Sequence, residues 1–82
     1  MNEQEAIHHF KNALKRVRNM TPEAFFRECD ALYLKEVKTT EFVSKCKESN
    51  LGLDEKTLHF LTNIMDENFS GTISIYEYYF TL

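Results

Sequence analysis

Residues Asp66–Glu77, DENFSGTISIYE, decide the fold of this 82-residue chain. Oxygen donors occupy their first, third, fifth, seventh, ninth and twelfth positions, as Asp66, Asn68, Ser70, Thr72, Ser74 and Glu77. Thr72 would offer its backbone carbonyl, Glu77 both carboxylate oxygens, and Ser74 its hydroxyl directly or through a water. Gly71, at the sixth position, permits the positive φ that a sharp turn needs. Because Ca²⁺ prefers about six to eight oxygen ligands, the spacing predicts a calcium-binding loop. The alternative is a plain Asn/Gly/Ser surface turn.

This pattern resembles the loop of the EF-hand superfamily, which lies between two helices. Ile73, at the eighth position, is the kind of β-branched residue that suits a short strand paired with a second loop. Only two side-chain ligands, Asp66 and Glu77, carry charge. We therefore expect one Ca²⁺, bound with a dissociation constant on the order of 10⁻⁶ to 10⁻⁴ M, and Mg²⁺ as its competitor.

A second frame of the same length lies upstream, at Asp30–Glu41, DALYLKEVKTTE. Val37 occupies its eighth position, in register to pair with the equivalent residue of the other loop. Leu32 and Leu34 stand at ligand positions but offer no oxygen, and Lys35 replaces the glycine with a charge that repels cations. We expect this loop to bind no calcium and to serve the architecture. The alternative is an unrelated helix–loop–helix.

The two frames together predict an all-α fold. It is a paired EF-hand lobe, in which two helix–loop–helix units are joined by a short two-stranded β-ribbon, with an extra N-terminal helix. Hand one spans 21–49 with its degenerate loop at 30–41, and hand two spans 54–82 with its loop at 66–77. The chain resembles one lobe of the calmodulin, troponin C and myosin light-chain group more closely than the small dimeric EF-hand proteins, whose first loop is lengthened. The last helix is short, which favours a fragment of a longer protein over a native pocket left partly open.

Residues 1–20 form a predicted amphipathic helix, with apolar residues three and four apart at Ile7, Phe10, Leu14 and Val17. The segment holds four basic and two acidic residues, whereas the whole chain has a net charge of −3. Three roles are open: a wall packed permanently on the core, a helix that occupies the lobe's own groove under calcium control, or a helix that docks on a partner or an anionic membrane. Thr21 and Asp54 would cap the helices that lead into the two loops.

Several function classes find little support in the sequence. Cys29 and Cys46 have no metal-type spacing and are expected to be reduced thiols, a single disulfide being the weaker alternative. No stretch predicts a membrane span, a signal peptide or a lipidation site. Neither a nucleophile with its base nor a basic–aromatic cluster is present, so we expect no enzyme and no nucleic-acid partner. A cytoplasmic location is expected, with a cytoskeletal or ciliary association as one version of it.

Two functions follow from the resemblance. The first is a calcium sensor that exposes an apolar groove for an amphipathic helix of a target protein, or for its own N-terminal helix. The residues expected to line that groove are Phe26, Phe42, Leu61, Ile64 and Phe80. The second is a calcium-independent, light-chain-like or adaptor subunit of a motor or cytoskeletal assembly. Calcium-dependent exposure of apolar surface would distinguish the two.

Overall fold

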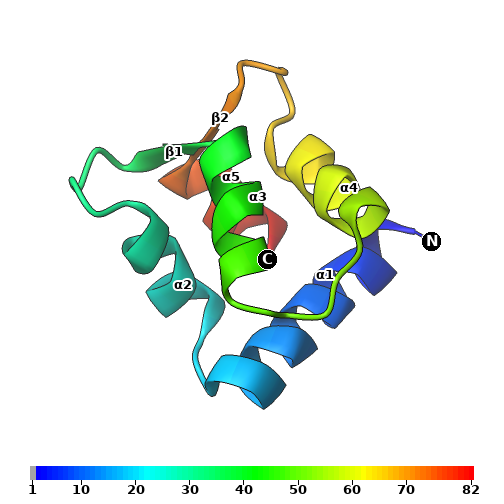
Figure 1. The fold of residues 1–82 in the computed structure, drawn as a ribbon. Coiled ribbons are helices and arrows are strands. Elements are labelled where there is room, and N and C mark those ends of the chain that lie inside the picture. The colour runs from blue at the N-terminus through cyan, green and yellow to red at the C-terminus, as the bar shows by residue number, and fades with distance from the viewer. Residues whose placement is uncertain (1) are drawn as a thin grey trace.

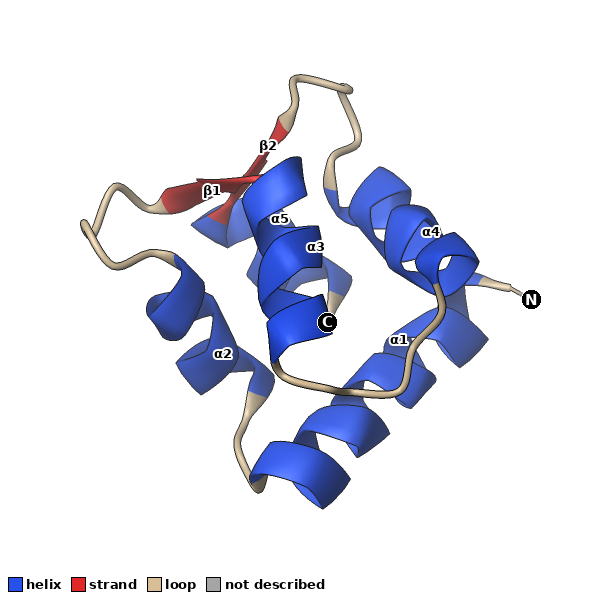
Figure 2. Cartoon of the chain, in the orientation of Figure 1, coloured by secondary structure: helices blue, strands red, loops and turns tan. Residues whose placement is uncertain are grey.

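Helices make up most of the computed structural model, which describes residues 2–82; Met1, the first residue of the predicted 1–20 segment, lies outside this range. The order α2–β1–α3 recurs as α4–β2–α5, with each strand between two helices (Figures 1 and 2). The elements are α1 (Glu3–Ala13), the π-helix η1 (Leu14–Arg18), α2 (Pro22–Cys29), β1 (Glu36–Lys38), α3 (Thr39–Glu48), α4 (Glu55–Met65), β2 (Thr72–Ser74) and α5 (Ile75–Thr81).

The two strands form an antiparallel ribbon between the loops. Val37 of β1 faces Ile73 of β2, which confirms the register predicted from their positions in the two frames. Both side chains are buried, so this pair also joins the ribbon to the core. Both loops project from the end of the molecule where the strands pair, and α1 runs along the opposite end (Figure 1).

The helix starts follow the capping signals in the sequence. Thr21 Oγ1 accepts a hydrogen bond from the backbone N–H of Ala24 at 3.2 Å, and Pro22 opens α2. Asp54 Oδ1 accepts one from the N–H of Thr57 at 2.8 Å at the start of α4. Hydrogen bonding from Thr57 lowers the pKa of the Asp54 carboxyl, because the bonds favour its charged form. Both predicted caps are confirmed.

The N-terminal segment differs from a regular amphipathic helix. It is α-helical only to Ala13, continues as the π-helix η1, and ends at Asn19, which has a left-handed φ of 50°. A π-turn closes i→i+5 hydrogen bonds and so widens the helix, which rotates later residues away from the face set earlier. Phe10 and Leu14 are buried as expected, but Val17, predicted on the same face, is 43% exposed.

An aromatic cluster at the centre of the core joins the N-terminal helix to both helix–loop–helix units. The ring of Phe10 in α1 lies 5.6 Å from those of Phe25 and Phe42 and 6.4 Å from that of Tyr78, measured between centroids. Tyr78 also donates a hydrogen bond from its hydroxyl to the carbonyl of Pro22 at 2.7 Å. Elements from the start, middle and end of the chain therefore share one core.

The two cysteines are free thiols, Cys46 buried and Cys29 partly buried. Among the described residues, no helix combines the length and apolar character needed to cross a membrane.

Candidate metal-binding loop

Asp66 organises the second loop from its first position. It caps the C-terminal end of α4 and is 4% exposed. Its Oδ1 accepts hydrogen bonds from both the backbone N–H and the hydroxyl of Ser70, each at 3.0 Å, and its Oδ2 accepts one from the N–H of Gly71 at 2.8 Å. One buried carboxylate thus sets the path of the next five residues.

The side chain of Ser70 brings further oxygens beside this carboxylate. Its hydroxyl lies 3.2 Å from the carbonyl oxygen of Thr72 and 3.1 Å from the Thr72 hydroxyl. Oxygens from the first, fifth and seventh positions are therefore neighbours, and they include a carboxylate and a carbonyl, the donor types that Ca²⁺ prefers. The donor set of this part of the loop fits a hard divalent cation.

The last predicted ligands, Ser74 and Glu77, are engaged with each other at the start of α5. Glu77 Oε1 accepts a hydrogen bond from the N–H of Ser74 at 2.9 Å, and Ser74 Oγ accepts one from the N–H of Glu77 at 3.1 Å. This reciprocal pair is a capping box. The loop pattern predicts metal binding for both residues; the Ser-x-x-Glu spacing also signals this cap, which is absent from that prediction.

The predicted ligands are thus only partly assembled. Asp66, Ser70 and Thr72 lie together, Ser74 and Glu77 form a separate pair, and Asn68 is exposed. Within residues 2–82, no three His, Cys, Asp or Glu side chains are grouped closely enough to hold a metal ion. A cation in this loop would therefore depend on neutral oxygens as well as on Asp66 and Glu77.

The first loop repeats the backbone of the second without the oxygen donors that the sequence predicts as ligands there. Asp30 Oδ1 accepts a hydrogen bond from the N–H of Leu34 at 2.9 Å, and its Oδ2 accepts one from Lys35 at 2.8 Å. These are the positions that Ser70 and Gly71 occupy opposite Asp66. Tyr33 and Lys35 have positive φ, as do their counterparts in the second loop, Phe69 and Gly71.

Leu32 and Leu34 stand at ligand positions of the first loop and line one hollow with Asp30 and Glu41, but their side chains offer no oxygen. Leu32, Tyr33 and Leu34 are 77%, 82% and 65% exposed. The loop therefore keeps a shape set by one aspartate and backbone amides, and it lacks the oxygens that would bind an ion.

The residues expected to line a partner groove are not one surface in this structure. Phe26, Phe42 and Leu61 belong to the core, Ile64 is partly buried against it, and Phe80 is 89% exposed. Phe10 of α1 packs against Phe42, so the N-terminal helix covers this region. The structure brings three of the five residues together and leaves Phe80 apart from them.

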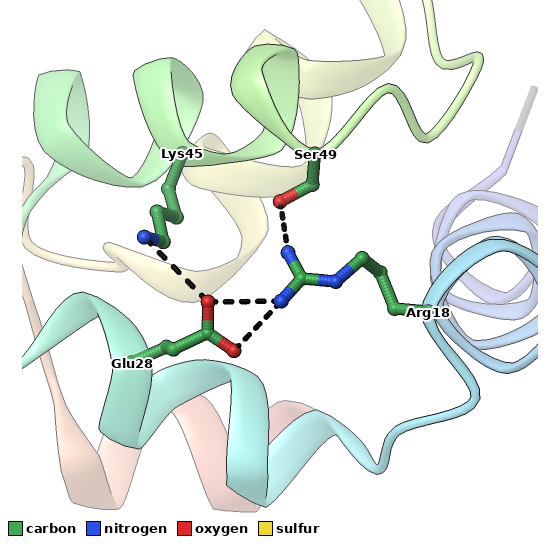
Figure 3. Close-up of polar contacts among 4 residues, drawn as sticks. All are labelled: Arg18, Glu28, Lys45 and Ser49. Carbon is green, nitrogen blue, oxygen red and sulfur yellow. Dashed lines mark hydrogen bonds and ion pairs between the residues drawn. The ribbon is translucent and has the colours of Figure 1, made fainter.

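A polar cluster that the sequence does not predict joins the N-terminal segment to both helices of the first unit (Figure 3). Arg18 of η1 donates from Nη2 to both carboxylate oxygens of Glu28 in α2 at 3.1 Å, and from Nη1 to the Ser49 hydroxyl at 2.9 Å. Lys45 of α3 lies 3.6 Å from the same Glu28 carboxylate. The spacing of these residues in the sequence carries no local signal for this contact.

Comparison of the chain with family models, with curated proteins and with solved structures finds no match.

Proposed function

We propose that the chain is a calcium-binding regulatory module, built as a paired EF-hand lobe with a degenerate first hand. Asp66, Asn68, Ser70, Thr72, Ser74 and Glu77 would hold one Ca²⁺. The observation that carries this proposal is that the Ser70 hydroxyl lies 3.0 Å from the Asp66 carboxylate and 3.2 Å from the Thr72 carbonyl, so that three oxygens gather in one part of the loop. A plain surface turn needs no such set of oxygens.

The capping box suggests how binding of Ca²⁺ in the loop would change the packing of the core. A bound divalent cation supplies positive charge for the two carboxylates of the loop. Recruitment of Glu77 as a ligand would draw its carboxylate from the N–H of Ser74 and so alter the start of α5. Tyr78 follows directly, and its ring lies 4.8 Å from Phe26 and 6.2 Å from Phe42. A shift of α5 therefore acts on the aromatic cluster.

The expected partner is an amphipathic helix of a target protein that replaces or extends the contacts of α1. Support comes from the packing of Phe10 against Phe25, Phe42 and Tyr78, by which a helix outside the two helix–loop–helix units places an aromatic ring in their shared core. An opened lobe would offer the same site to another helix.

The second candidate is a calcium-indifferent, light-chain-like subunit. The observation that favours it is the same closed core: α1 already buries Ala6, Phe10 and Ala13, and η1 buries Leu14, so no calcium-dependent opening is needed for stability. In that case α1 is a permanent wall and partners bind elsewhere.

A calcium titration of the Glu77→Gln variant, followed by calorimetry and ¹H–¹⁵N NMR, tests the proposal. The substitution keeps the shape of the side chain and removes the charge, so the dissociation constant should rise by about tenfold or more from the expected 10⁻⁶ to 10⁻⁴ M. Glu67→Gln is the matched control, because Glu67 lies in the same loop at an exposed position with no assigned oxygen ligand. It should leave affinity nearly unchanged.

Three outcomes separate the candidates. Shifts that spread to Phe10, Phe42 and Tyr78 on saturation support the regulatory module. Shifts confined to residues 66–77 support the calcium-indifferent subunit. Equal affinities for both variants, or no binding below millimolar calcium, would contradict the metal site itself.

A further inference from the structure

The hydroxyl of Tyr78 is a polar group inside the aromatic cluster. Tyr78 is buried, and among the buried aromatic residues within 2–82 it is the only one that carries a hydroxyl. This hydroxyl donates to the carbonyl oxygen of Pro22 at 2.7 Å, although the two residues are 56 positions apart. A buried hydroxyl without such a partner would destabilise the fold. Phenylalanine would pack as well, so the particular contribution of tyrosine is a bond from α5 to the first residue of α2.

The start of α5 is held separately, at the ribbon. Ile75, its first residue, donates its backbone N–H to the carbonyl oxygen of Lys35 at 2.8 Å. The capping box of Ser74 and Glu77 holds the same end of the helix. Tyr78 lies about one helical turn further along, so a rotation of α5 about its start displaces the Tyr78 hydroxyl. The ribbon is then the pivot of the movement, and Tyr78 is the group that reaches α2.

The acceptor of this hydrogen bond lies at a well-defined end of α2. Pro22 has a restricted φ, and the preceding Thr21 caps the helix by accepting from the N–H of Ala24. Directly before this start is the turn at residues 19–21, where Asn19 has its left-handed φ and the N-terminal segment ends. A displacement of Pro22 therefore acts on the junction between the N-terminal segment and α2.

We propose that the Tyr78 hydroxyl couples the start of α5 to this junction. A change at the capping box rotates α5 about the ribbon, the hydrogen bond draws Pro22 with it, and the N-terminal segment changes its packing on the core. The signal is that of the proposed function, recruitment of Glu77 by Ca²⁺, on which this regulatory role rests. The coupling itself needs no ion, because it consists of contacts within the chain.

A double-mutant cycle in the presence of a chelator tests the coupling without calcium. Ser74→Ala removes the hydroxyl that caps α5, and it should shift the ¹H–¹⁵N resonances of residues 23–26 at the start of α2. Tyr78→Phe keeps the ring and removes the bond, so in this background the same shifts should fall to about half or less. Tyr79→Phe is the matched control, because it makes the same change one residue later in a side chain that is 40% exposed. It should leave the shifts unchanged.

Three results of the cycle would overturn the proposal. They are equal shifts of residues 23–26 in the wild-type and Tyr78→Phe backgrounds, no shifts in the wild type, and an equal loss of shifts in Tyr79→Phe. Glu77→Gln perturbs the same capping box and keeps the shape of the side chain, so it takes the place of Ser74→Ala if that variant unfolds.

A calcium titration of the wild type and Tyr78→Phe then tests the use of the coupling by the metal loop. Shifts of residues 66–77 in both proteins, with shifts of residues 19–26 reduced in Tyr78→Phe, support the proposal. Equal shifts of residues 19–26 in the two proteins contradict it. If neither protein binds calcium, the proposed function fails, and the cycle in chelator still decides the coupling.

Discussion

Gly71 and Lys35 occupy the same position of the two loops, and both have a positive φ, of 85° and 64°. A Cβ added at Gly71 would meet no atom within 4 Å, so only backbone strain opposes a side chain there. We expect Gly71→Ala to lower the free energy of unfolding by about 1 kcal/mol, and Lys35→Gly to change it little or raise it, because glycine relieves strain but adds freedom to the unfolded chain. Urea denaturation of both variants measures the difference. Equal destabilisation by the two substitutions would contradict the assigned backbone.

The thiols carry a second prediction at the residue scale. Burial raises the pKa of Cys29 from its ordinary value of 9.0 to about 12, and raises that of Cys46 as well. Between about pH 9 and pH 12, the Cys29 thiol ionises in the unfolded chain and stays protonated in the folded chain. The contribution of the buried thiols to the free energy of unfolding is therefore intact below about pH 9 and declines as the pH rises toward 12. Iodoacetamide labelling at pH 8, followed by mass spectrometry, should be slow in the native protein and fast in urea. Equal rates would show that the thiols are accessible.

At the scale of elements, the contact of η1 with α2 and α3 depends on Arg18. The Arg18, Glu28 and Lys45 side chains are each about a third exposed, so solvent weakens the ion pairs. We expect Arg18→Ala to lower the free energy of unfolding by about 1 kcal/mol, and by less at high salt, where the ion pairs are screened. It should also raise the rate of hydrogen exchange in residues 14–18. Arg16→Ala, on the same helix at an exposed position, is the matched control. If the two variants unfold at the same urea concentration, the contact in Figure 3 contributes nothing measurable.

The sequence predicted elements best where the signal was local. The sequence predicted the helix caps at Thr21 and Asp54, because each cap depends on residues close in the chain. It also predicted the pairing of Val37 with Ile73, because both hold the same position in a repeated frame. The change from α- to π-helix at Leu14 was not readable. A π-turn has no distinct periodicity over five residues, and the exposure of Val17 follows from it.

For the whole molecule, the decisive contact is that of Phe10 with rings from both helix–loop–helix units. Phe10→Ala should lower the free energy of unfolding by about 3–5 kcal/mol, a large part of the total stability of a domain of this size. Phe10→Leu keeps most of the volume and should cost clearly less. Both should unfold in one transition by circular dichroism and NMR, since α1 shares the core. Loss of α1 alone, with the rest still folded, would instead mark it as a displaceable helix.

The sequence by itself determined the two loop frames, their ribbon and the absence of side-chain oxygens at Leu32 and Leu34 of the first loop. These depend on residue types at fixed spacing, and a glycine, an aspartate or a β-branched residue acts within a few positions of itself. Only the tertiary structure decided that α1 lies against Phe42 and that Arg18 binds Ser49. Such contacts join residues far apart in the chain. Packing of the whole core settles them, and no local pattern encodes that packing.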